Sequence, residues 1–244
     1  MITQQQNTDK QNDLQIKKTA CTRCGICCKK GGPSIHFEDR ELIEKGNIPL
    51  KYLFTIRPDE PLFDNIKEKI EPAKSDIIKI KNKNNSHACI FYDPDDSGCQ
   101  IYEARPLECR KLKCWDTKEI VSFYDTTRIS RKELLFSLDE LWSLVLNHQD
   151  RCSYQKVATL AGQIKQNKND HTALQKLNDI IQYDSSLRQL MVEKNPMISE
   201  KLEFLFGRPL TLTILLYGLK LKQSSDIIKE NNNKSEKILT KYMT

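Results

Sequence analysis

The chain has 244 residues, 30% of them charged, and a mean hydropathy of −0.60. This length allows one large domain or two small ones with a substantial core, and the polarity indicates a soluble protein. The longest apolar stretch, residues 210–221, is interrupted by threonines, a glycine and a lysine. Because it is shorter than the roughly 20 residues that cross a bilayer, we expect no membrane segment.

The start of the chain indicates the compartment. Residues 1–20 are polar and mixed in charge, and they contain neither the basic nor the apolar part of a secretory signal. We therefore expect a cytoplasmic protein, in a reducing environment where structural disulfides are rare. The net charge of +6 is spread over lysines without interleaved aromatic residues, so no nucleic acid is expected. The sequence leaves open whether the protein binds another protein.

Composition divides the chain into four parts and predicts an α+β fold that is mostly α. A small cysteine-rich metal-binding domain with short strands is followed by a helical region. The parts are a disordered N-terminal tail over 1–18, the cysteine-rich domain over 19–118, the helical region over 119–222 and a Lys/Asn-rich tail over 223–244.

The cysteine-rich part predicts short elements. Residues 77–80 and 89–92 are rich in β-branched or aromatic residues, which is typical of strands. The run 93–98, Asp-Pro-Asp-Asp-Ser-Gly, is a strong turn signal. Residues 101–113 predict a helix in which Pro106 is tolerated only in the first turn.

The region after residue 119 has helical spacing throughout. Apolar residues recur at intervals of three and four between positions 134 and 146, as on one buried helix face. Further helices are predicted around 153–167, 171–183, 185–194 and 198–206, with a last apolar helix after Gly207 and Pro209.

Eight of the nine cysteines lie between Cys21 and Cys114. The first three, spaced Cys-x2-Cys-x2-Cys, can point at a common centre from a tight loop, as in the start of a bacterial ferredoxin run. Cys28 then follows Cys27 directly, so these two serve different centres or one of them bridges. The candidate metal ligands are Cys21, Cys24, Cys27, Cys28, Cys89, Cys99, Cys109 and Cys114.

Zinc and an iron–sulfur cluster compete as occupants of these thiolates. Each takes four cysteines per centre, so eight suffice for two of either. Zinc modules favour paired Cys-x2-Cys units, whereas most of the later cysteines here are single and dispersed, which slightly favours an iron–sulfur cluster. The odd cysteine count and the missing export signal argue against a disulfide framework.

Other residues have both a functional and a plainer interpretation. His148 and Cys152 share a helix face and could complete a site, or form a buried thiol beside a hydrogen-bonded histidine. His87 could ligate zinc or simply be exposed. Nearby cations would lower thiolate pKa values or belong to an ordinary lysine-rich surface. These cations are Arg23, Lys29, Lys30, Arg105, Arg110, Lys111 and Lys113.

Two segments resemble a known family. The burst Cys-x2-Cys-x2-Cys-Cys and the later run Cys99-Gln-Ile-Tyr-Glu-Ala-Arg-Pro-Leu-Glu-Cys109-Arg resemble the CxxCxxCC cysteine-cluster family of YkgJ type, described as a zinc- or iron-chelating domain. The resemblance implies that 19–118 is such a domain. It implies seven ligands, namely Cys21, Cys24, Cys27, Cys28, Cys89, Cys99 and Cys109.

The expected function is metal binding by one or two cysteine-ligated centres, with the precise role open. Some relatives in this family are flagellin lysine N-methylases, so a metal-dependent enzyme acting on protein is the alternative. Such an enzyme needs S-adenosylmethionine, and the sequence has no Gly-x-Gly nucleotide loop after a strand. Whether the chain is an enzyme therefore stays open.

Overall fold

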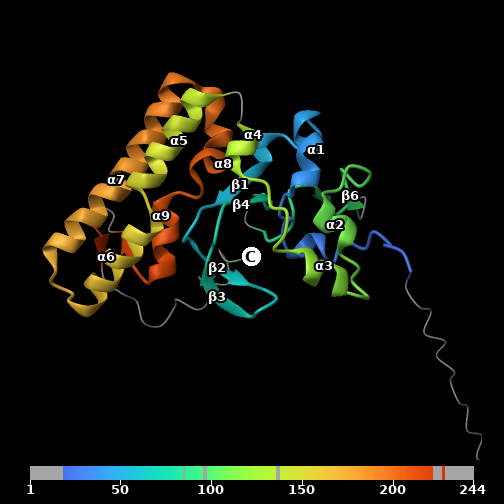
Figure 1. Ribbon diagram of the computed structural model, residues 1–244, viewed down its shortest axis with the longest axis horizontal. Helices are drawn as coiled ribbons and strands as arrows, with labels where there is room; N and C mark the ends of the chain where they lie inside the picture. Colours follow the sequence, from blue (N-terminus) through green and yellow to red (C-terminus); the bar gives the residue numbers. More distant parts are fainter. Residues whose placement is uncertain (1–18, 85, 96–97, 136–137, 222–226, 229–244) are drawn as a thin grey trace, which may run out of the picture.

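The computed structural model describes residues 19–84, 86–95, 98–135, 138–221 and 227–228. Over these residues the predicted α+β fold with mostly helical content is confirmed. Helices α5, α6, α7 and α9 gather at one end of the molecule, and α2, α3 and β6 lie at the other, with β1 and β4 between them (Figure 1). The predicted tail 1–18 lies outside the described residues, as does 223–244 apart from β8.

The strands pair in twos, all antiparallel, over the part of the chain that is described. β1 pairs with β4, β2 with β3, β5 with β6 and β7 with β8. The prediction of a strand over 77–80 is confirmed by β4, whereas the strand expected over 89–92 is reduced to β5. The bounds are Leu53–Ile56 (β1), Pro61–Asp64 (β2), Lys69–Pro72 (β3), Ile77–Ile80 (β4), Tyr92–Asp93 (β5), Gly98–Cys99 (β6), Lys220–Leu221 (β7) and Ile227–Ile228 (β8).

Short helices surround the cysteine-rich part, and long ones follow it. The helix expected over 101–113 is confined to α2, because Pro106 has no N–H to donate and its ring disfavours helix in the residues before it. The α-helices are Arg40–Glu44 (α1), Leu107–Lys111 (α2), Lys118–Phe123 (α3), Arg131–Leu134 (α4), Asp139–Arg151 (α5), Tyr154–Gln166 (α6), His171–Lys194 (α7), Leu202–Phe206 (α8) and Leu210–Thr213 (α9). The 3₁₀ helices are Cys28–Lys30 (η1), Phe37–Asp39 (η2), Leu50–Tyr52 (η3), Pro196–Lys201 (η4) and Ile214–Tyr217 (η5).

Helix α7 is continuous where two helices were predicted. The predicted helices over 171–183 and 185–194 meet at Asp184, and the Asp-Ser-Ser run at 184–186 has a weak local preference for helix. In the structure Asp184 is fully buried and accepts hydrogen bonds from His148, Arg188 and the backbone of Leu210. These tertiary bonds override the local preference. None of the described helices combines the length and apolar character needed to cross a bilayer.

The larger hydrophobic core runs across the predicted boundary at residue 118. Strands β1 and β4 form its centre, and α8 packs on β1, where the Thr55 hydroxyl donates to the Phe204 carbonyl at 2.7 Å. Its buried members include Ile35, Leu53, Ile78, Ile80 and Phe91 from the first part, and Ile129, Leu135, Val145, Phe204 and Phe206 from the second. A second core lies among α6, α7, α9 and η5.

A buried ion pair also joins the two parts. Arg131 at the start of α4 is fully buried, and its Nε and one terminal nitrogen each donate to Asp76 at 2.8 Å. Its other terminal nitrogen donates to the Leu205 carbonyl at 2.7 Å. Because Asp76 directly precedes β4, this pair ties the central strands to α4 and α8.

We predict that Asp76→Ala lowers the free energy of unfolding by roughly 3–5 kcal/mol, because it leaves the Arg131 guanidinium buried without its carboxylate. Urea denaturation followed by circular dichroism measures this. The matched control is Glu44→Ala, which removes a half-exposed carboxylate 2.7 Å from Arg40 and should cost about 1 kcal/mol or less. Similar small losses of unfolding free energy in both variants would contradict a stabilising role for the Arg131–Asp76 pair.

Candidate metal centre

The cysteine burst forms a loop with two left-handed residues. Arg23 has a φ of 56° and Gly25 a φ of 71°. Gly25 is buried against the ring of Tyr92, and a Cβ placed there would lie 2.3 Å from a ring carbon. Glycine is thus required at this position both for its backbone angle and for the close approach. The loop then enters η1, which begins at Cys28.

Backbone hydrogen bonds bring two more cysteine segments to this loop. The amide of Cys89 donates to the carbonyl of Cys28 at 2.8 Å. The Cys89 carbonyl accepts from the amide of Tyr92 at 2.9 Å, and Tyr92 pairs with Cys99 in the β5–β6 hairpin. Cysteines distant in sequence therefore lie together before any metal is considered.

Helix α2 carries Cys109 to the same place. Pro106 precedes its first residue, as predicted, and the Leu107 amide donates to Asp39 Oδ1 at 2.8 Å. Asp39 is fully buried, and its other oxygen accepts from the backbone of His36 at 3.1 Å. A remote carboxylate therefore caps the first turn of α2 and fixes where the helix begins.

Glu108 fixes the orientation of α2. Its Oε2 accepts from the backbone amide of Ser34 at 2.6 Å, and its Oε1 lies 3.2 Å from Nε2 of the buried His36. The other ring nitrogen of His36 lies 2.7 Å from the Thr126 carbonyl. Neighbouring side chains on a helix point in different directions, so anchoring Glu108 on one side leaves Cys109 on another.

Five cysteines from four segments then influence one another's ionisation: Cys27, Cys28, Cys89, Cys99 and Cys109. The Cys28 thiol hydrogen-bonds to Cys27, which lowers the pKa of Cys27 to about 6 and raises that of Cys28. Burial raises the pKa of Cys89 to about 11 and those of Cys99 and Cys109 above their usual value. A bound cation would lower these raised pKa values, because metal ligation replaces the thiol protons.

Two arginines supply positive charge to the cluster. The guanidinium groups of Arg23 and Arg105 lie 3.8 and 3.6 Å from the ring centre of Tyr102. Arg105 lowers the pKa of Cys27 and Cys99 by its charge, although hydrogen bonding and burial act more strongly there. Its Nε is buried without a hydrogen-bond partner among the described residues.

The remaining flanking cations serve other contacts. Arg110 lies 3.7 Å from Asp39, and Lys111 and Lys113 bind Glu119 at 2.9 and 2.8 Å. Arg110 therefore joins α2 to η2, whereas Lys111 and Lys113 stabilise the α2–α3 corner. Lys29 lies over the ring of Tyr92 at 5.6 Å from its centre.

The candidate ligands differ in exposure. Cys89 is buried, Cys28, Cys99 and Cys109 are half-buried, and Cys21, Cys24, Cys27 and Cys114 are exposed. The cysteines of the first motif are mostly exposed, and those of the later segments are buried or half-buried except Cys114. The inclusion of Cys21, Cys24 and Cys114 as ligands stays a prediction. His87 lies exposed in the loop before Cys89.

Comparison with known proteins agrees with this cluster. Residues 20–127 match the CxxCxxCC family model, whose description is "Putative zinc- or iron-chelating domain". Over these residues the chain is similar to that family, and we refer to this segment as the CxxCxxCC domain. The match confirms the resemblance expected from the sequence and supports metal binding, with zinc and iron both named. No solved structure matches the chain.

A second group of potential ligands lies outside the CxxCxxCC domain. His148, Cys152 and Asp184 are buried, with ligand atoms within 4.8 Å of one another. Asp184 accepts from His148 at 2.7 Å and from Arg188 at 2.9 Å. Burial lowers the pKa of His148 to about 4, raises that of Cys152 to about 12, and the Arg57 cation acts on both groups. Two nearby guanidinium groups disfavour a cation here, so the trio fits a hydrogen-bonded structural network better than a metal site.

Sequence reasoning missed the supports of α2 in the CxxCxxCC domain. Nothing in the sequence around His36 indicates a partner for its ring, and Asp39 lies in a short helical stretch as many surface carboxylates do. Glu108 stood within the recognised motif but had no assigned role. Only the fold shows that these three residues position Cys109.

We predict that Gly25→Ala weakens metal retention by about 10–100-fold, as changes in the supports of ligands generally do. The added methyl would collide with Tyr92 and displace the loop between Cys24 and Cys27. Metal analysis after dialysis against a weak chelator measures this. Gly46→Ala is the control, because Gly46 has a similar φ of 77° but nothing within 4 Å of its added Cβ. Equal retention in both variants would contradict the role of Gly25.

Proposed function

We propose that residues 20–127 hold a metal centre ligated by cysteine thiolates, and that an iron–sulfur cluster is favoured over zinc. The observation that carries the proposal is the convergence of Cys27, Cys28, Cys89, Cys99 and Cys109 from four segments. Crowded thiols whose ionisation burial opposes are an unfavourable arrangement for a protein without a cation to bind them.

The donor set fits a soft, thiophilic centre. The five interacting groups are all sulfur donors, which select zinc or iron–sulfur clusters over hard cations. The positive charge of Arg105 and Arg23 nearby would offset the net negative charge of a thiolate-bound centre. The dispersed positions of Cys89, Cys99 and Cys109 support a cluster, since zinc modules favour paired ligands.

Purification without oxygen distinguishes the two occupants. We expect brown protein containing iron and acid-labile sulfide, with the amounts given by elemental and sulfide analysis. Colourless protein with stoichiometric zinc would reject the preference for iron while keeping the ligand set. Protein that contains neither, even after anaerobic reconstitution, would reject the metal centre.

Single Cys→Ser variants rank the ligands. Cys89→Ser and Cys109→Ser should lose most of the bound metal, because an alcohol is a poor ligand for a soft centre. Cys152→Ser is the matched control, since Cys152 is buried in the other core and lies beside two arginines. Retained metal in Cys89→Ser and Cys109→Ser would contradict the assignment. Metal loss in Cys114→Ser would add Cys114 to the ligands, and retention would remove it.

A further inference from the structure

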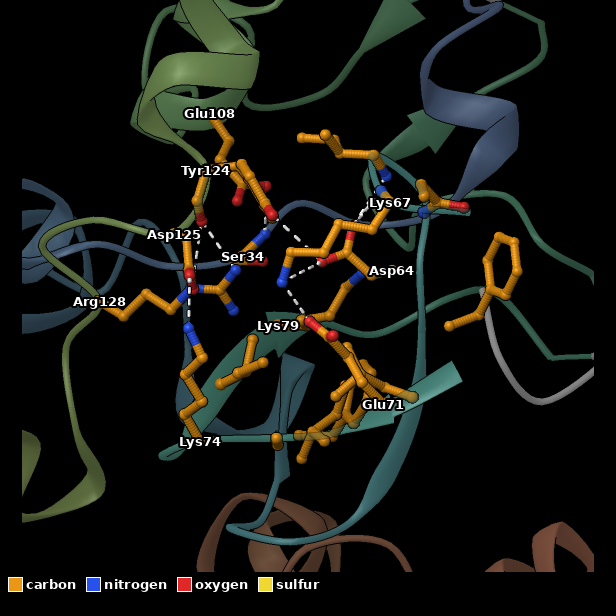
Figure 2. A pocket seen from close by; sticks show the side chains of 18 of the residues that line it. Ser34, Asp64, Lys67, Glu71, Lys74, Lys79, Glu108, Tyr124, Asp125 and Arg128 are labelled. Atoms are coloured by element: carbon orange, nitrogen blue, oxygen red, sulfur yellow. Dashed lines mark hydrogen bonds and ion pairs between the residues drawn. The ribbon is translucent and has the colours of Figure 1, made fainter. Parts of the chain in front are cut away.

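A cavity of about 800 Å³ lies beside the CxxCxxCC domain, between the β1–β4 ribbon, the β2–β3 hairpin and helices α2 and α3. This volume is in the range of pockets that bind small molecules, roughly 300–1,000 Å³. Figure 2 shows Lys67, Lys74, Lys79, Tyr124 and Arg128 around it. None of the candidate metal ligands lines this cavity, so it is distinct from the metal centre.

Strand alternation decides which residues face the cavity. On β4, Ile78 and Ile80 belong to the large core, whereas Ile77 and Lys79 line the cavity. On β1, Leu53 is in the core, and Phe54 and Ile56 line the cavity in the same way. Further apolar walls come from Leu62, Leu112, Ile120 and Val121.

The charged groups of the cavity are almost completely paired among the described residues. Five of the six cationic side chains that line it have an acidic partner within 4 Å. Lys67 binds Asp64 and Glu71, Lys74 lies 3.6 Å from Asp125, Lys81 2.8 Å from Glu203, Arg128 3.7 Å from Asp125, and Arg208 2.5 Å from Glu60.

Lys79 is the exception within the described part of the chain. Its ammonium group has no hydrogen bond or ion pair there, and burial lowers its pKa below the usual value. Glu108 acts on it electrostatically, but both Glu108 oxygens already bind Ser34 and His36. An unpaired cation at the edge of an apolar cavity gains strongly from an anion that enters it.

We propose that this cavity binds a small monocarboxylate with an apolar tail, whose carboxylate pairs with Lys79 and whose tail packs on Phe54, Ile56 and Ile77. One unpaired cation matches one negative charge, whereas a dianion would also meet the carboxylates of Asp64, Glu71 and Asp125. The apolar lining favours a tail, because a tail packed there would shield the partly exposed Phe54 and Leu62 from water.

Octanoate is a suitable probe, and the full chain with its native metal content is titrated with it by calorimetry. We expect saturable binding that is weakened about tenfold or more by Lys79→Met, the loss expected from removing one charge-assisted hydrogen bond. The control Lys74→Met removes a paired cation from the same rim and should change affinity less than about twofold. Lys79→Arg keeps the charge and should retain binding.

Three outcomes would overturn the proposal. They are no saturable binding of octanoate at millimolar concentration, equal affinity of the Lys79→Met and Lys74→Met variants, and equally tight binding of 1-octanol, which has the tail without the charge. If Lys79→Met does not fold, methyl chemical shifts of the wild-type protein decide. Shifts induced by octanoate at Ile56, Ile77, Leu62 and Val121 would support the cavity, and shifts confined to the α5–α7 helices would reject it.

Discussion

The crowding of cysteine thiols whose ionisation is disfavoured is the constraint on which the cysteine-rich part depends. Cys27, Cys89, Cys99 and Cys109 each oppose the ionisation of another cysteine, and burial acts in the same direction. The fold nevertheless fixes them in place through ordinary backbone bonds, such as the one between Cys89 and Cys28. The fold therefore gathers thiols whose ionisation is disfavoured until a bound cation replaces their protons.

Helix α2 links this constraint to the rest of the molecule. Consecutive residues of the helix face different environments, because Cys109 interacts with the other thiols while Glu108 borders the cavity and Lys79. Asp39 and His36 hold both residues at once by fixing the start and rotation of the helix.

The sequence predicted the parts of the site that carry their own signal. These parts are the cysteine motifs, the turn after Cys89 and the proline before α2. They could be predicted because glycine, proline and cysteine each occur in a small number of structural contexts. The strand over 77–80 was also predicted, from its β-branched residues, although Ile-Ile-Lys-Ile does not alternate strictly between apolar and polar residues. The fold explains that pattern: Ile77 packs with Ile56 and Ala73 in a small buried cluster beside the cavity, so both faces of β4 carry isoleucine and only Lys79 marks the solvent-accessible side.

What the sequence could not give are contacts between residues far apart in the chain. Asp39 to Leu107 spans 68 positions, and Thr55 to Phe204 spans 149. Neither contact leaves a local pattern, because a capping aspartate on a remote helix resembles any surface carboxylate. The unbroken α7 has the same origin, since Asp184 is held by partners on three other elements or turns of helix.

The β1–β4 ribbon is the structural link between the helical part and the cysteine-rich part. One face of the ribbon is covered by α8, with Phe204 bonded to Thr55, and the other face forms the floor of the cavity. An isolated two-stranded ribbon is marginally stable in water. The helices therefore support the ribbon from behind, and the Arg131–Asp76 clamp holds them against it. The opposite face carries the small cluster of Ile56, Ala73 and Ile77 and borders the cavity, with Lys79 at the edge of an otherwise paired set of cations.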